Sequence, residues 1–377
     1  MYLVCHTQHV MKTFLVLSLG VTPTHAWFCV SDVDIYDTSI YPFVFISQYV
    51  ASKSFIIITH ETLHKLATEI SFEKDTRNLI LVDNTARCGS TLMCQMFYKL
   101  PNTRVMSEPW ALQHTSMVRD NYRGHPWLYN PKEDITQMSE KDFTKLITSV
   151  TKVLFKYENK KEYDRVVLKV SVTLGQLVPY IKKTMPRIKC IMMTRHVKIS
   201  IESFEKMLRG WGPALSNVKH IVKANDLILN WCPFPYADDK LMDMKKRYVD
   251  MNKKDAMAIL KVRLIMYGSS LLNFLHHKSL YMHTVVFEDL MKNTKEELEL
   301  MYQKLDIPTE LVVNAMEALK THSQRGVFTS NVLVKSKNKT IFSDSDWEIC
   351  DSLFEEMGLP ITKDMSIDQL RDLMQLK

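Results

Sequence analysis

The sequence predicts an α/β fold with a central parallel sheet and helices on both faces, and three observations support this prediction. Short continuous apolar runs recur along the chain, as is typical of strands buried in a parallel sheet. Segments with apolar residues at helical spacing alternate with these runs. The 377 residues are 46% hydrophobic and 24% charged, the composition of a folded chain with a sizeable core. In such a fold we expect ligands to bind at the carboxyl ends of the strands.

The first predicted strand is the run Leu-Ile-Leu-Val at 79–82, and a loop follows it directly at 83–91. The helix that comes next is indicated by apolar residues at helical spacing from Leu92 to Leu100. A strand, a glycine-containing loop and a helix in this order present backbone N–H groups and a helix N-terminus to an anion. The loop is therefore the first candidate binding site.

Further apolar runs and periodic segments continue the pattern. Strands are predicted at 104–106, 166–168, 190–193 and 283–287. Helices are predicted at about 140–157, 174–184, 198–208, 242–275, 294–304, 309–319, 345–357 and 366–376. The strand at 104–106 is expected to lie beside the first strand, and 321–339 is expected to be a long loop over the sheet edge.

This pattern divides the chain into three parts. Residues 1–75 are predicted to be a non-catalytic N-terminal extension, 76–360 the main domain, and 361–377 a C-terminal helix or tail. No apolar run reaches the roughly 18 to 20 residues that a membrane-spanning helix needs. The run 13–21, followed by small residues, resembles a short signal peptide if translation begins at Met11, so the extension is a candidate signal or anchor segment.

Charge and cysteine content exclude several classes. Lys and Arg number 49 against 42 Asp and Glu, a net charge of +7 that is interspersed along the chain. This mild excess permits a phosphorylated or sulfated ligand but, without a block of five like charges, does not indicate nucleic acid. The seven cysteines include no CxxC pair and no histidine at zinc-ligand spacing, so we predict neither a metal site nor a dense disulfide framework.

The loop differs from the GxxxxGK[ST] loop of nucleotide triphosphatases. Ser90 follows Gly89 where that motif has lysine, and Asn84 stands at the first glycine position. The cation is instead Arg87, two places upstream, and the hydroxyls of Ser90 and Thr91 open the helix. A small-molecule kinase should have lysine after the glycine, so this reading is an alternative rather than the first choice.

A cysteine phosphatase built on Cys88 is nearly excluded by the same loop. Its Cys-x₅-Arg cradle would place arginine at position 94, where the sequence has Cys94. The loop therefore favours an anion-binding role without a nucleophilic thiol.

Residues 85–92 (Thr-Ala-Arg-Cys-Gly-Ser-Thr-Leu) resemble the 5′-phosphosulfate loop of sulfotransferases that use 3′-phosphoadenylyl sulfate (PAPS), particularly the carbohydrate and tyrosylprotein branches. A second element is similar to the same family, because the strand at 190–194 runs into Arg195 and Ser203 follows eight residues later. The resemblance also covers Val-Phe-Glu-Asp-Leu at 286–290 and Ser-Gln-Arg-Gly at 323–326, and it extends from about 78 to 360.

This resemblance implies a P-loop three-layer sandwich that binds PAPS as co-substrate and needs no metal. The residues it implies for cofactor binding are Arg87, Cys88, Gly89, Ser90, Thr91, Arg195, Ser203 and Arg325. Arg195 and Ser203 would converge on the 3′-phosphate, because a guanidinium and a hydroxyl both donate to phosphate oxygens. The chain departs from the family where His196 and Val197 stand in place of Asp-Pro or Asn-Pro, and where Cys88 replaces a serine.

Glu108, at the end of the second predicted strand, is the candidate general base. Its carboxylate is expected to point into the crevice above the loop, and some family members have a glutamate at a comparable position. The alternative is a carboxylate that caps a turn or pairs with a cation. Lys169, at the end of the third strand, is a candidate for the same crevice.

Structural alternatives also stay open for the cofactor residues. Arg87 is a candidate catalytic residue as well, and the alternative is a surface arginine on a turn. Ser90 and Thr91 are alternatively helix N-cap residues, and Arg195 could pair with Glu202 or Glu205 on a helix surface.

The sequence thus predicts an enzyme that transfers a sulfuryl group from PAPS to a hydroxyl acceptor, a carbohydrate or a tyrosine side chain, and releases adenosine 3′,5′-bisphosphate. A P-loop small-molecule kinase and a non-catalytic PAPS-binding module are the alternatives. The segment 110–140, rich in aromatic and cationic residues, is expected to bind the acceptor. A glycosylation sequon at Asn338 is consistent with the Golgi or secretory lumen, with the cytoplasm as alternative.

Overall fold

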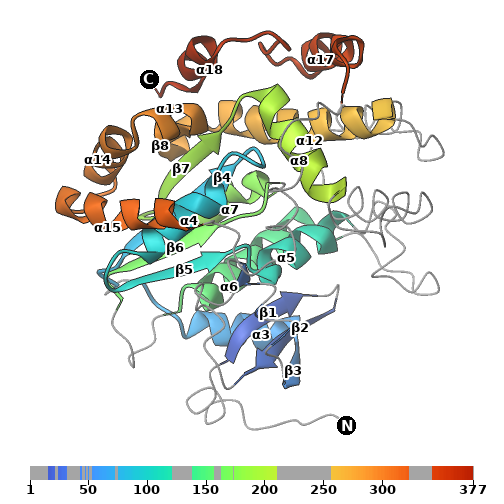
Figure 1. Ribbon diagram of the computed structural model, residues 1–377. Helices are drawn as coiled ribbons and strands as arrows, with labels where there is room; N and C mark the ends of the chain where they lie inside the picture. Colours follow the sequence, from blue (N-terminus) through green and yellow to red (C-terminus); the bar gives the residue numbers. More distant parts are fainter. Residues whose placement is uncertain are drawn as a thin grey trace.

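The structure, a computed structural model, describes residues 16–21, 24–31, 43–44, 47, 50, 53–72, 75–120, 138–156, 163–172, 174–209, 256–321 and 342–376. Its centre is a parallel sheet of five strands in the order β5-β6-β4-β7-β8 (Figure 1). The strands are β4 (Asn78–Asn84), β5 (Thr103–Ser107), β6 (Arg165–Lys169), β7 (Lys189–Thr194) and β8 (Tyr281–Val286). This arrangement confirms the predicted α/β fold.

Strand β4 has a special position in the sheet. The chain adds β5 and β6 on one side of β4 and then crosses to add β7 and β8 on the other side. The carboxyl end of β4 is therefore the topological switch point, where open α/β sheets bind their ligands. The expectation that β5 lies beside β4 is wrong, because β6 pairs with both of them. Apolar runs identify buried strands but do not specify their order.

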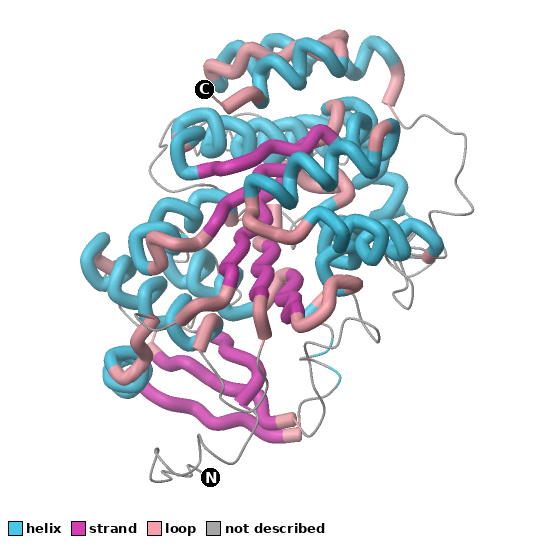
Figure 2. The backbone as a smooth tube through the Cα atoms, turned by 90° about the vertical axis from the view of Figure 1, so that its left-hand side faces the viewer, coloured by secondary structure: helices cyan, strands magenta, loops and turns pink. Residues whose placement is uncertain are grey.

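Two layers of helices cover the sheet, as Figure 2 shows from the side. Alternate strand residues face opposite layers: Ile80 and Val82 pack into one buried cluster, and Leu79 and Leu81 into the other. The first cluster is completed by α4 (Ser90–Tyr98), α14 (Thr294–Lys304) and α15 (Val312–Met316). The second includes α6 (Glu140–Leu154), α7 (Val178–Thr184) and α12 (Ala256–His276). The three-layer sandwich is thus confirmed.

Most predicted helices are present with shifts of a few residues. Helix α14 has the predicted bounds, while α8 (Val197–Arg209), α17 (Asp344–Met357) and α18 (Ile367–Met374) each differ slightly. The helix predicted at 309–319 is instead α15 flanked by the short 3₁₀ turns η4 (Thr309–Leu311) and η5 (Glu317–Lys320). Helix α5 (Trp110–Asp120) was not predicted. Residues 242–255 and 322–339 lie outside the described residues.

The N-terminal segment contains a second, antiparallel sheet. Strands β1 (Val16–Val21), β2 (His25–Val30) and β3 (Ser54–Thr59) pair in chain order, and α3 (His60–Thr68) follows. Strand β1 packs against α5, and α3 packs against α6. The candidate signal segment overlaps β1, and in the described part of the chain no helix is both long and apolar enough to cross a membrane.

Candidate active site

The loop after β4 has a backbone suited to holding an anion. Ala86 (φ 68°), Arg87 (φ 46°) and Gly89 (φ 82°) all adopt positive φ angles. Non-glycine residues in this region cost of order 1–3 kcal/mol each and cluster at ligand sites. Gly89 is the N-cap of α4 and supplies no side-chain acceptor to the helix. Successive N–H groups in such a turn, followed by a helix N-terminus, form a concave anion site.

Gly89 is required at its position for a second reason. A Cβ atom added there would lie 2.3 Å from the ring of Phe287, which begins α13 (Phe287–Lys292). Ser90 and Thr91 are then the first two residues of α4, so they do not act as N-caps. Both are buried. The loop therefore contacts Phe287, directly after β8, with no room for a side chain at position 89.

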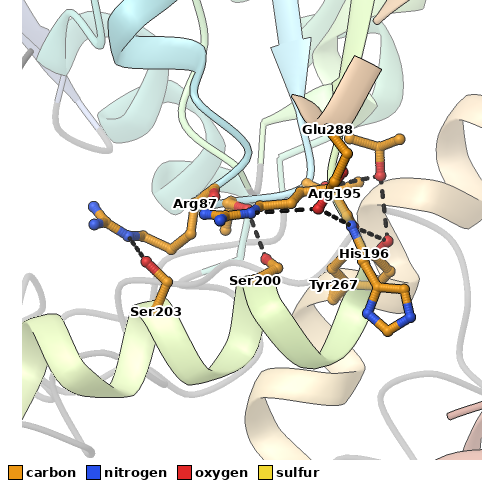
Figure 3. A network of polar contacts seen from close by, with 10 residues as sticks. Arg87, Arg195, His196, Ser200, Ser203, Tyr267 and Glu288 are labelled. Carbon is orange, nitrogen blue, oxygen red and sulfur yellow. Dashed lines mark hydrogen bonds and ion pairs between the residues drawn. The ribbon is translucent and has the colours of Figure 1, made fainter. Parts of the chain in front are cut away.

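Arg87 points from the loop toward α8 (Figure 3). Its Nε donates a hydrogen bond to Ser203 Oγ at 3.2 Å, and Ser200 Oγ donates to the carbonyl of Ala86 at 2.8 Å. Burial and, to a smaller extent, the charge of Arg195 lower the pKa of Arg87 to about 10. Ser203 was expected to act with Arg195, whereas its hydrogen-bond partner among the described residues is Arg87.

Arg195 follows β7 and lies on the other side of the loop. Its Nη1 donates to the carbonyl of Arg87 at 3.3 Å, and its guanidinium carbon lies 4.5 Å from the Phe287 ring centroid. Its Nε is buried 3.6 Å from Glu288 Oε1, too far for a hydrogen bond, and has no hydrogen-bond partner in the described part of the chain. Burial lowers the pKa of Arg195.

The alternative partners predicted for Arg195 do not contact it. Glu202 lies 3.8 Å from Lys206, and Glu205 lies 3.8 Å from Arg263. Arg195 is thus not part of a helix-surface salt bridge on α8. The two guanidiniums lie on either side of the loop and are both partly desolvated, and a bound anion would offset the cost of burying their charges.

A chain of hydroxyl groups fixes this end of the sheet. Thr85 Oγ1 lies 3.2 Å from Thr194 Oγ1, which lies 3.2 Å from the hydroxyl of Tyr267 on α12. Tyr267 donates to the carbonyl of Arg195 at 2.7 Å. The network fixes the positions of the loop, β7 and α12 relative to one another. Sequence analysis missed Tyr267, because no local pattern connects a tyrosine in the middle of an apolar helix to a loop far away in the chain.

Glu108 and Lys169 form an ion pair near the loop. Lys169 ends β6 and its Nζ contacts the Glu108 carboxylate; the side chains are 3% and 20% exposed respectively. Glu108 has a φ of 53°, and its N–H donates to the carbonyl of Lys169 at 2.9 Å. Its charge raises the pKa of Arg87, opposing the effect of burial. Lys169 ends the strand between β5 and β4, and the salt-bridge alternative for Glu108 describes its contact here.

The N-terminal segment also contributes to this part of the site. The ring centroid of Phe43 lies 5.2 Å from Lys169 Nζ, a distance typical of a cation–π contact. Trp27 of β2 packs against Trp110 and His114 of α5, with ring centroids 6.4 and 5.7 Å apart. Burial lowers the pKa of His114 to about 4. The segment predicted to be a non-catalytic N-terminal extension therefore contacts the candidate site.

The remaining predicted site residues divide into two groups. Cys88 is buried in the loop, and burial raises the pKa of its thiol, so it stays protonated at neutral pH. Arg325, residues 121–137 of the predicted acceptor segment and the sequon lie outside the described residues. Within the described ranges there is no group of three or more His, Cys, Asp and Glu side chains that could hold a metal ion.

Comparisons with known proteins agree with this geometry. A model of the sulfotransferase family matches residues 84–310. No curated protein matches the chain.

Among solved structures, the chain is similar to the sulfotransferase domain of the Synechococcus PCC 7002 olefin synthase, with 14% identity, 77% of this chain and 98% of that chain covered, and a TM-score of 0.35. It is also similar to a sulfotransferase of Mycobacterium avium, with 10% identity, 79% and 80% covered, and a TM-score of 0.39. At these TM-scores the structural likeness carries no weight by itself.

Proposed function

The chain belongs to the sulfotransferase family, and on that premise we propose that it transfers the sulfuryl group of PAPS to an acceptor hydroxyl and releases adenosine 3′,5′-bisphosphate. The observation that carries the proposal is the pair of partly buried guanidiniums, Arg87 and Arg195, on either side of a loop of positive φ angles. The loop N–H groups and both arginines favour a ligand with more than one anionic group.

The two arginines would bind different ends of this ligand. Arg87 belongs to the loop itself and lies nearest to the N-terminus of α4, which suits the 5′-phosphosulfate. Arg195 leaves the neighbouring strand, and its buried Nε makes no hydrogen bond in the part of the chain that is described, which suits the 3′-phosphate. Ser203, bonded to Arg87, would lie between these two positions.

Glu108 would act as the general base. In the transfer, the acceptor oxygen forms a bond to sulfur while the bond from sulfur to the phosphate oxygen breaks, and Glu108 takes the proton that the hydroxyl loses. Lys169 holds the carboxylate in place through the ion pair. Arg87 and the loop N–H groups stabilise the negative charge that develops on the leaving phosphate oxygen.

A carbohydrate is the first acceptor class to test, since the aromatic rings of Trp27 and Trp110 pack together at the start of α5, the element that follows Glu108. Tyrosine peptides and small alcohols are the other classes. A location in the secretory lumen remains a prediction from the sequence.

The test is a binding measurement with adenosine 3′,5′-bisphosphate, AMP and ATP, each with and without EDTA. We expect the bisphosphate to bind more tightly than AMP or ATP, and to do so in EDTA, because no lysine follows Gly89 to accompany Mg²⁺. Arg195→Ala should weaken the bisphosphate at least about tenfold, since a charge-assisted hydrogen bond contributes about 1.5 to 3 kcal/mol. Equal affinity for AMP and the bisphosphate would contradict the assignment, and an absolute Mg²⁺ requirement with ATP preference would favour the kinase alternative.

A further inference from the structure

The C-terminal segment, residues 361–376, lies beyond the part of the chain that matches the family, yet it contacts both elements that surround Arg195. Figure 1 shows α17 and α18 lying over α12, β8 and α13. Ile361, Leu370 and Met374 of this segment are each at most 3% exposed and belong to the main buried core. The segment is therefore packed into the domain and is not a detached tail.

One contact is made to the residue directly after Arg195. His196 Nε2 lies 2.9 Å from the carbonyl of Met365. Because a carbonyl can only accept, the imidazole donates from Nε2. The His196 N–H in turn donates to Glu288 Oε1 at 3.3 Å. His196 stands where many family members have Asp-Pro or Asn-Pro, so here a side-chain bond to the C-terminal segment fixes the turn instead of a proline ring.

Nearby charged contacts connect the same surfaces. Lys198 lies at the start of α8, and its Nζ is 3.1 Å from the carboxylate of Asp364 in the C-terminal segment. Arg371 donates two hydrogen bonds to Asp289, from Nε at 2.8 Å and from Nη2 at 2.7 Å. Asp289 is 13% exposed in its side chain and directly follows Glu288. The bidentate geometry is specific to arginine.

These contacts hold Arg195 between two anchored neighbours. On one side Met365 fixes His196, and on the other side Arg371 fixes the first turn of α13, which supplies Phe287 beneath the guanidinium and Glu288 beside it. A shift of that turn would move both the ring and the carboxylate that orient Arg195. The position of the guanidinium therefore depends on the C-terminal segment.

We propose that Arg371 and His196 are positioning residues through which the C-terminal segment determines how tightly the site holds a 3′-phosphate group. The inference rests on the proposed function, because it assigns the 3′-phosphate to Arg195. It predicts a specific loss: binding of a 3′-phosphate weakens while binding of the 5′-phosphate at the loop is nearly unchanged.

The experiment measures dissociation constants for adenosine 3′,5′-bisphosphate and AMP by calorimetry on the full chain. In Arg371→Ala and His196→Ala we expect the bisphosphate to bind about fivefold to tenfold more weakly, with AMP changed by less than about twofold. Arg371→Lys should recover part of the loss, and His196→Gln, which keeps a donor, should recover most of it. Asp289→Asn provides a second way to weaken the Arg371 contact while keeping the side-chain shape.

The matched control is Lys189→Ala. Lys189 begins β7, the strand that ends before Arg195, and pairs with Asp306 at 2.7 Å at the opposite end of the sheet. This variant should keep the wild-type ratio of the two affinities. Unchanged ratios in folded Arg371→Ala, His196→Ala and Asp289→Asn, or an equal loss in Lys189→Ala, would overturn the inference alone. A wild type that does not distinguish the bisphosphate from AMP would overturn the proposed function together with it.

Discussion

Arg87 and Glu108 are charged side chains of the same site with separable roles. Arg87 lies in the loop after β4, and in the proposed reaction its charge would act on the bound ligand and on the transition state alike. Glu108 follows β5 and pairs with Lys169, and in the proposed reaction it would act on the acceptor hydroxyl. Substitutions that preserve size therefore should affect binding and turnover differently.

For Glu108→Gln we expect affinity for adenosine 3′,5′-bisphosphate to change by less than about twofold while turnover falls about 10² to 10⁴-fold, because the amide cannot accept the proton. Arg87→Ala should lower both quantities. The measurement combines bisphosphate titration with a radiolabelled PAPS assay against glycans, tyrosine peptides and small alcohols. Near-normal turnover in Glu108→Gln would assign the base to another residue. Tight bisphosphate binding by a wild type inactive on every acceptor would favour the binding-module alternative.

At this scale the sequence identified individual residues but not their contacts. The loop motif and its spacing singled out Arg87 and Arg195, and the end of a predicted strand singled out Glu108. The structure places all three at the carboxyl edge of the sheet. The sequence did not reveal that Ser203 accepts a hydrogen bond from Arg87 or that Lys169 pairs with Glu108. Such partners come from elements far apart in the chain, whose relative positions depend on tertiary packing.

The unit formed by β4, the loop and α4 depends on the backbone conformation and the space available at Gly89. Gly89 needs both a positive φ and the absence of a Cβ, because the Phe287 ring would lie 2.3 Å from that atom. Phe287 also packs against the Arg195 guanidinium. A change at Gly89 should therefore reach both arginines through the displaced ring.

We expect Gly89→Ala to lower bisphosphate affinity more than about tenfold and to lower the melting temperature. The matched control is Gly358→Ala, at the C-cap of α17, where φ is also positive (75°) but no atom lies within 4 Å of an added Cβ. Both variants incur a backbone cost of about 1 kcal/mol. The control should lose stability without losing affinity, as measured by thermal unfolding and calorimetry. Equal affinity in both variants would contradict the role given to the Phe287 contact.

Elements were predictable where local pattern determines them. The apolar runs and helical periodicity identified all five strands of the central sheet and gave α14 its correct bounds. Strand order was not predictable, because the apolar runs in β4 and β5 are the same whether or not β6 lies between the two strands. The breaks around α15 and the existence of α5 were also missed, since short turns of helix depend on neighbouring elements more than on their own sequence.

The whole chain is more continuous than its predicted division into extension, domain and tail. The N-terminal sheet packs on α5, and the C-terminal segment packs against β8 and shares the main core. Local patterns in these regions are short and resemble a signal segment or an isolated helix, so only tertiary contacts reveal that they belong to the fold. Three buried titratable groups, His114, His283 and Asp83, make the stability of the folded chain depend on pH.

His114 and His283 each have a pKa lowered by burial to about 4 in the folded protein, below the ordinary value of 6.5. Between these values the unfolded chain binds more protons, so stability rises with pH, is fully present above 6.5 and is lost as pH falls toward 4. Asp83 acts in the opposite direction, because burial raises its pKa from 3.8 to about 6. Its folded form binds more protons, so its contribution to stability falls as pH rises from 3.8 to 6.

Two substitutions should therefore change the pH profile of unfolding with opposite signs. His114→Phe keeps a ring against Trp27 and Trp110 but cannot titrate, so the rise of unfolding free energy between pH 4 and 6.5 should be shallower by about 1.4 kcal/mol per pH unit. Asp83→Asn keeps an oxygen that accepts from the N–H of Asn84, while its amide donates to the hydroxyl oxygen of Tyr281, which in the wild type donates to Asp83. The rise between pH 4 and 6 should be steeper by a similar amount. The measurement is urea unfolding at half-unit pH intervals, with the wild type measured in parallel. If the slope of unfolding free energy against pH changed in the same direction in both variants, either the lowered pKa of His114 or the raised pKa of Asp83 would be contradicted.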